Sequence, residues 1–205
     1  MAYRERAGTL LIADLSGYTE YLGQAELAHA QAIVSRLLEA IIEAAGERFE
    51  LIKLEGDAAF FVADDGAIAG PELHATIARM FRRFHKTLAV ITATTTCGCA
   101  GCACACKLGL KFVAHHGRFG EHEIRGLREL IGPDVILVHR LLKNGTGLRE
   151  YALFTRAVLQ RWHELACRLD VWHRYGYDHL GAVEVAVCDL RALLSASESQ
   201  ERVTA

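Results

Sequence analysis

The chain has 205 residues, of which 52% are hydrophobic and 23% charged, and its formal net charge is −2 at pH 7. This length is sufficient for one domain with a sizeable core, and the near-neutral charge gives no support for a nucleic-acid-binding surface. No apolar run reaches the roughly 18 residues that a membrane-spanning helix needs. We therefore expect no membrane partner, and the near-neutral charge likewise leads us to expect no nucleic-acid partner.

The N-terminal stretch, MAYRERAGTLLIADLSG, has a basic start and a short apolar run, but no small-residue cleavage site. Asp14 interrupts the run, so residues 9–15 are interpreted as a buried first strand and not as a signal peptide, which favours the cytoplasm. The segment SGYTEYL then turns the chain. A long amphipathic helix is expected over residues 26–46, because apolar residues recur there at helical spacing.

Residues 50–62, ELIKLEGDAAFFV, predict two strands around a Gly56–Asp57 turn. A second helix is expected over residues 71–90, since Pro71 stands at a favoured first-turn position. Residues 94–107 consist of threonine, glycine, alanine and cysteine before a final lysine. This composition predicts a cysteine-rich loop insertion.

In the second half of the chain, the apolar pattern predicts a strand, a helix and further strands. These are residues 108–117, residues 132–144, residues 151–160 as one or two strands, and residues 180–190. The resulting order indicates an α+β fold of the ferredoxin-like group, a mixed or antiparallel sheet with helices packed on it. Because no linker divides the chain, we expect one domain over residues 1–192 and a disordered tail over residues 193–205.

Five of the seven cysteines lie within ten residues: Cys97, Cys99, Cys102, Cys104 and Cys106. They are too close together for a disulfide framework, and in a reducing compartment such a cluster indicates free thiols or metal ligands. Cys-x-x-Cys suits one chelating turn of a Zn²⁺ site, and alternating thiolates could also take Cu(I). The alternative is a small-residue loop with free thiols.

Four short motifs follow one another along the chain. They are DLSGYT at residues 14–19, KLEGD at residues 53–57, a strand ending in HHG at residues 115–117, and a helix with VHRL at residues 138–141. In order and spacing, they resemble the catalytic domain of the class III adenylate and guanylate cyclases, over residues 9–190. Within that superfamily, the chain is similar to a set of uncharacterised bacterial cyclase-related proteins with a cysteine-rich segment.

The resemblance implies a site for Mg²⁺ or Mn²⁺. Cyclisation of a nucleoside triphosphate requires attack of the ribose 3′-hydroxyl on the α-phosphorus, and two metal ions can activate the hydroxyl and bind the triphosphate. In the family, the aspartates that correspond to Asp14 and Asp57 hold the metals, with the backbone carbonyl of Leu15. The backbone groups that would cradle the phosphates belong to Gly17, Tyr18 and Thr19. From the residues alone, the alternative is a pair of solvated acids at a strand end and in a turn.

The resemblance also assigns the nucleotide. Lys53 corresponds to a lysine that donates to adenine N1, and Glu129 stands where adenylate cyclases have an aspartate that accepts from the adenine amino group. Arg140 corresponds to an arginine that stabilises charge on the α-phosphate, a task for which the guanidinium fork is suited. Four residues before it, active cyclases have an asparagine that orients the ribose, whereas this chain has Ile136, which cannot hydrogen-bond to the ribose.

The resulting hypothesis is a homodimeric domain that binds a purine nucleotide, with ATP favoured, together with Mg²⁺ or Mn²⁺, and with weak or lost cyclisation. In the family, one protomer supplies the aspartates and the other the lysine and arginine, so a symmetric dimer would contain two sites. Two alternatives stay open. One is a non-catalytic sensor or interaction module whose cysteine-rich segment is a metal or redox site, and the other is a different phosphotransfer or nucleotide-hydrolysing enzyme on the same scaffold.

Overall fold

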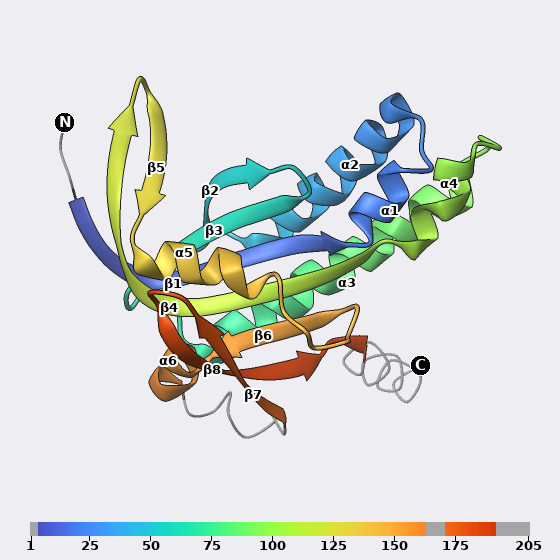
Figure 1. Cartoon of the computed structure of the whole chain (residues 1–205). Helices are drawn as coiled ribbons and strands as arrows, with labels where there is room; N and C mark the ends of the chain where they lie inside the picture. The colour runs from blue at the N-terminus through green and yellow to red at the C-terminus, as the bar shows by residue number, and fades with distance from the viewer. Residues whose placement is uncertain (1–3, 163–170, 192–205) are drawn as a thin grey trace, which may run out of the picture.

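The computed structural model describes residues 4–162 and 171–191 of the chain (Figure 1). Its centre is an eight-stranded sheet in the order β2-β3-β1-β4-β6-β8-β7, with β5 paired to β4. The strands are β1 (Arg4–Ser16), β2 (Glu50–Glu55), β3 (Ala58–Asp64), β4 (Gly109–Ile124), β5 (Leu127–Ile131), β6 (Tyr151–Thr155), β7 (Val171–Tyr177) and β8 (Gly181–Asp189). Strands β4 and β6 pair in parallel, and the other pairings are antiparallel.

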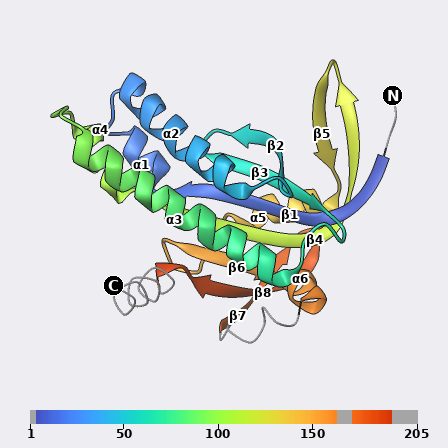
Figure 2. The same cartoon turned by 180° about the vertical axis from the view of Figure 1, so that it is seen from behind.

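Helices cover both faces of this sheet. They are α1 (Tyr18–Leu22), α2 (Leu27–Ala45), α3 (Gly70–Thr94), α4 (Ala100–Cys104), the 3₁₀ turn η1 (Ala105–Lys107), α5 (Pro133–Leu141) and α6 (Arg156–Arg161). Figure 2 shows α2 and α3 lying across one face, while α5 lies on the opposite face in Figure 1. None of the described helices is long and apolar enough to cross a membrane.

Strand β1 lies in the middle of the sheet and is buried on both faces. Leu11 and Ala13 point into the core formed with α2 and α3, whereas Leu10 and Ile12 point into the core formed with α5. This alternation explains why residues 9–15 form an almost unbroken apolar run, since a strand covered on both faces needs apolar side chains at every position. The predicted α+β fold, with helices packed on a mixed sheet, is confirmed.

Three segments differ from the prediction. The SGYTEYL segment contains the short helix α1 and is not only a turn. Residues 94–107 are not a loop throughout, because α4 and η1 are helical. Cys102 and Ala105 pack there into the core, so tertiary contacts support a helix that the composition did not predict. Residues 151–160 change from strand to helix at Arg156, where α6 begins and its apolar side chains turn into the same core.

Strand β4 continues to Ile124 and does not end at the HHG motif, residues 115–117. It returns as β5 through a tight turn at Arg125 and Gly126, which both have positive φ, 53° and 79°. This is the backbone that a two-residue hairpin requires, but arginine is an unusual residue for its first position, so the sequence signal for the hairpin was weak. Strand β7 was also missed, and the predicted tail, residues 193–205, lies outside the described residues.

Candidate nucleotide and metal sites

Asp14 and Asp57 lie close together where β1 approaches the β2–β3 turn. The amide of Leu15 donates to the carbonyl oxygen of Asp57, at 3.2 Å, and Gly56 allows the turn through its positive φ of 68°. Burial raises the pKa of Asp57 to about 6, and the charge of Asp14 acts in the same direction. The site therefore holds negative charge that its surroundings compensate only in part.

Lys111 of β4 contacts this pair, although the sequence analysis did not single it out. Its Nζ lies 2.9 Å from Oδ2 of Asp14, and the two side chains are only 21% and 14% exposed. The two residues are direct neighbours in the β1–β4 ladder. Asp14, Asp57 and the carbonyl of Leu15 are oxygen donors of the kind that Mg²⁺ and Mn²⁺ prefer, so the donor set fits. A cation bound to Asp14 would, however, compete with the Lys111 ammonium.

A hollow of about 350 Å³ lies beside this end of β1 and is referred to below as the phosphate-side hollow. Its lining is Ser16, Gly17, Lys111, Leu142, Asn144, Thr146, Gly147, Leu148, Arg149 and Tyr151. Gly17 has φ 83°, a left-handed backbone conformation that favours glycine, and the guanidinium of Arg149 lies directly beside it. Lys111 and Arg149 give the hollow two cationic groups. Tyr18 and Thr19 follow as the first residues of α1 and are not among the lining residues.

Lys53 and Glu129 form an ion pair between β2 and β5, with Nζ and Oε2 3.1 Å apart. Lys53 is also 2.9 Å from Oε1 of Glu55. Burial acts to lower the pKa of Lys53, but its hydrogen bonds to the two carboxylates outweigh this effect and leave the pKa raised. The hairpin that the sequence analysis missed carries Glu129 to Lys53, so the structure brings together the two residues that the resemblance assigned to one base.

Arg140 and Ile136, one turn apart on α5, line a second hollow of about 520 Å³, referred to below as the base-side hollow. Its lining is Lys53, Glu55, Val135, Ile136, His139, Arg140 and Lys143. Ile136 is 51% exposed, and Nε2 of His139 lies 2.8 Å from Oε2 of Glu55. The two hollows have no lining residue in common. The predicted site residues therefore form two separate groups within one chain.

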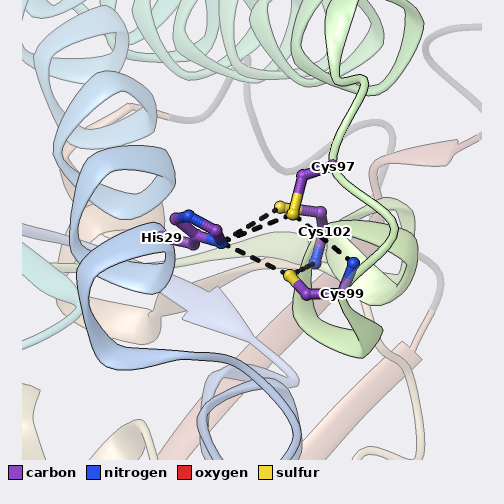
Figure 3. Close-up of side chains that lie close together, drawn as sticks. All are labelled: His29, Cys97, Cys99 and Cys102. Carbon is purple, nitrogen blue, oxygen red and sulfur yellow. Dashed lines mark hydrogen bonds between the residues drawn. The ribbon is translucent and has the colours of Figure 1, made fainter.

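The cysteine-rich segment also divides into two sets. Cys97, Cys99 and Cys102 face His29 of α2, as Figure 3 shows, and one ligand atom from each of the four residues lies within 4.8 Å of the others. His29 was not predicted, because it is about 70 residues away and its position in α2 follows no recognisable motif. The hydrogen bond from His29 lowers the pKa of Cys99 to about 6.

The remaining two cysteines of the segment have other partners. Sγ of Cys104 donates to Oε1 of Gln24, at 3.0 Å, and Sγ of Cys106 donates to the carbonyl of Ala103. The six cysteines in the described part of the chain are all free thiols. The structure thus brings three of the five cysteines together with a histidine from a distant helix, in a group that could hold a metal ion.

Comparison with known proteins gives two kinds of match. Residues 34–151 match the family described as "Protein of unknown function (DUF2652)". The "Uncharacterized protein Rv2561/Rv2562" of Mycobacterium tuberculosis is 36% identical over 157 residues, which cover 77% of this chain and 73% of that protein.

Solved structures that match this chain include adenylyl and guanylyl cyclases. The adenylyl cyclase CyaB from P. aeruginosa has a TM-score of 0.64 at 14% identity, over 92% of this chain and 97% of its own. The guanylyl cyclase Cya2 has a TM-score of 0.68 at 12% identity, over 92% and 95%. The catalytic core of a rhodopsin-guanylyl cyclase, solved in complex with ATPαS, has a TM-score of 0.60 at 12% identity, over 91% and 97%. At these identities, the likeness establishes the fold alone. The chain therefore belongs to the family described as "Protein of unknown function (DUF2652)", and its fold is that of the class III adenylyl and guanylyl cyclase domains.

Proposed function

We propose that this protein binds a purine nucleoside triphosphate, with ATP favoured, together with Mg²⁺ or Mn²⁺, as a homodimer with weak or lost cyclisation activity. The observation that carries the proposal is the position of Asp14 and Asp57 next to a hollow with two cationic side chains. Carboxylates for a metal ion and cations for phosphates are the two halves of a metal–triphosphate site. A protein of the same fold, at 12% identity, was solved with ATPαS bound.

On the metal side, Asp14, Asp57 and the carbonyl of Leu15 would hold the cation. A bound cation would polarise the attacking hydroxyl and screen the charge of the phosphates. Lys111 would then turn from Asp14 towards the triphosphate, because its ammonium loses its carboxylate partner to the metal. Arg149 and the turn at Gly17, with Tyr18 and Thr19 behind it, complete the phosphate contacts.

On the base side, Lys53 donates to the ring nitrogen of adenine, and Glu129 accepts from the exocyclic amino group. Both side chains are partly exposed, 32% and 44%, so they can exchange their mutual ion pair for contacts with a base. Arg140 contributes charge stabilisation near the α-phosphate. The ammonium of Lys53 can only donate hydrogen bonds and the carboxylate of Glu129 can only accept them. A purine with a donor at the ring nitrogen and an acceptor at the exocyclic position would therefore fit less well.

The two hollows, which share no lining residue, support a dimer. One nucleotide needs both the phosphate-side and the base-side groups, and within one chain these line two hollows that share no residue. In a two-fold dimer, the phosphate-side hollow of one protomer faces the partner's Lys53 and the partner's Arg140, which gives two equivalent sites. Each chain is expected to be one domain, and the free thiols favour the cytoplasm.

The proposal is tested by calorimetric titration with ATP and Mn²⁺. We expect Asp57→Ala to weaken the binding of Mn²⁺–ATP by at least about tenfold, since a site with few ligands loses a direct carboxylate. Glu47→Ala is the matched control, because Glu47 is an exposed acid just before β2. Equal affinity in wild type and Asp57→Ala, with and without metal, contradicts the metal assignment.

The dimer is tested by mixing two defective variants. Asp57→Ala lacks the phosphate side and Arg140→Ala lacks the base side, so each homodimer has two impaired sites. A mixed dimer has one intact site, and we expect the equilibrated mixture to recover part of the high-affinity binding. A mixture that binds no better than either variant alone contradicts sites shared between protomers.

A further inference from the structure

We infer that His29, Cys97, Cys99 and Cys102 form a tetrahedral Zn²⁺ site that fastens the first turn of α2 to the connection between α3 and β4. The inference stands apart from nucleotide binding, because none of these four residues lines either hollow. It replaces a metal site built from the cysteine run alone with one that joins two distant segments of the chain.

The distances between the ligand atoms match zinc coordination. Nδ1 of His29 lies 3.4 Å from Sγ of Cys99, 3.6 Å from Sγ of Cys97 and 3.9 Å from Sγ of Cys102 (Figure 3). With Zn–N and Zn–S bonds of about 2.05 and 2.3 Å at tetrahedral angles, nitrogen and sulfur are separated by about 3.6 Å. The four side chains therefore surround a point at which Zn²⁺ would reach all of them after small adjustments.

The ligand types select zinc over copper. Three thiolates and one imidazole are an established structural zinc set, and Zn²⁺ accepts the tetrahedral arrangement without electronic preference. Cu(I) favours sulfur ligands, so two or three of the five thiols would satisfy it without a histidine. An imidazole nitrogen within 3.4–3.9 Å of three sulfurs is a specific feature that the zinc site explains.

The surroundings also suit thiolate ligands. The amide of Cys99 points at Sγ of Cys97, at 3.4 Å, and the amide of Cys102 points at Sγ of Cys99, at 3.3 Å. Such N–H···S contacts stabilise charged sulfur and hold it in position for a metal. The side chain of Tyr21 belongs to the same buried cluster as Cys102, and Cys99 packs against that cluster. The hydroxyl of Tyr21 is buried without a hydrogen-bond partner among the described residues.

Through Tyr21, the site reaches the turn beside the phosphate-side hollow. Tyr21 belongs to α1, and its amide donates to the carbonyl of Gly17. Helix α4 contacts both α1 and α2, and all three gather at one end of the molecule in both views (Figures 1 and 2). Zinc would therefore order α4 and stabilise α1, which is too short to be stable without tertiary contacts.

The test begins with the metal content of the full chain after anaerobic purification. We expect about one Zn²⁺ per chain in wild type. Cys99→Ser with Cys102→Ser should lose the metal, and His29→Ala should bind zinc at least about 100-fold more weakly in competition with a chromogenic chelator. Cys104→Ser with Cys106→Ser is the matched control, because it removes two thiols from the same segment and none from the site. Replacement of zinc by Co²⁺ should give the intense visible bands of a tetrahedral cobalt site with thiolate ligands.

A second measurement avoids variants that fail to fold. Removing zinc from wild type with a chelator should lower the thermal midpoint by about 5–10 °C and speed hydrogen exchange at the amides of residues 21–25, and added zinc should restore both. Metal-free wild type with freely titrating thiols and no response to zinc overturns the inference. Equal zinc affinity in wild type and His29→Ala overturns the assignment of His29. Loss of zinc in the Cys104/Cys106 control places the metal elsewhere in the segment. All these measurements are made without nucleotide, so they are independent of the proposed function.

Discussion

The ammonium of Lys111 lies 2.9 Å from the carboxylate of Asp14, at the position where the proposed metal ion must bind. The two residues face each other across β1 and β4, and both side chains are largely buried. An ion pair in this position neutralises one of the two aspartates while no cation is bound. It also supplies a cationic group that metal binding would release.

Replacing Lys111 by methionine tests this exchange. In chelator-containing buffer, Lys111→Met should be less stable than wild type by about 1–3 kcal/mol, because Asp14 loses its partner in a partly buried position. Mn²⁺ alone should then raise its thermal midpoint more than it raises that of wild type, since no ammonium has to be displaced. Lys107→Met, which removes a more exposed lysine, is the control. The same Mn²⁺ response in wild type and Lys111→Met would contradict the competition.

Asp57 should make stability depend on pH. Its pKa in the folded protein is about 6, above the ordinary value of 3.8, so the folded state binds this proton more tightly than the unfolded state. Without metal, this contribution to stability is fully present below about pH 4 and is lost as the pH rises to about 6.

Asp57→Asn should therefore be more stable than wild type above pH 6, by about 1–2 kcal/mol after allowance for the partial exposure of the group. The difference should vanish near pH 4. Urea unfolding at several pH values, in the presence of a chelator, measures it. A constant difference across this range would show that Asp57 is not the titrating group.

Lys53 should contribute to binding of the base and not to binding of the phosphates. We expect Lys53→Met to bind Mn²⁺–ATP roughly tenfold more weakly, because one hydrogen bond to the base is lost. Binding of inorganic tripolyphosphate with Mn²⁺, measured by the same titration, should stay unchanged. Lys86→Met, at an exposed position of α3, controls for the loss of one positive charge. Equal weakening of both ligands would indicate a phosphate contact instead.

By the resemblance to the cyclases, Ile136 is assigned to the position of an asparagine in active enzymes. The side chain is 51% exposed and lines the same hollow as Arg140, so Ile136→Asn should be tolerated with little change in stability. If this residue is what limits turnover, cyclic AMP formation should rise by about 10²–10³ over wild type, by analogy with other groups that act in the transition state. Arg140→Ala in the same background should abolish the gain.

Circular dichroism shows whether Ile136→Asn remains folded. A folded Ile136→Asn variant without detectable cyclic nucleotide would contradict the account of a cyclase that has lost its ribose contact. Vigorous activity in wild type would contradict it from the other side, because the asparagine would then not be required.

Local patterns in the sequence were sufficient to predict most of the central strands and helices. The apolar run at residues 9–15 predicted β1, the glycine at position 56 predicted the β2–β3 hairpin, and helical periodicity predicted α2 and α3. These features can be recognised from neighbouring residues only, because they reflect burial of one or both faces of an element or the backbone freedom of glycine. The α+β class followed from their order.

The contacts between distant segments were decided by the tertiary structure. Lys111 meets Asp14 because of the register of β1 and β4, and His29 meets the cysteines because α2 lies beside α4. The short helix α4 forms where Cys102 packs into the core, although the composition of the segment alone predicts a loop. The β4–β5 hairpin carries Glu129 to Lys53 through an Arg–Gly turn with a weak local signal. A single sequence therefore specifies which groups are available, while the pairing of strands and the packing of helices determine which of them come within bonding distance.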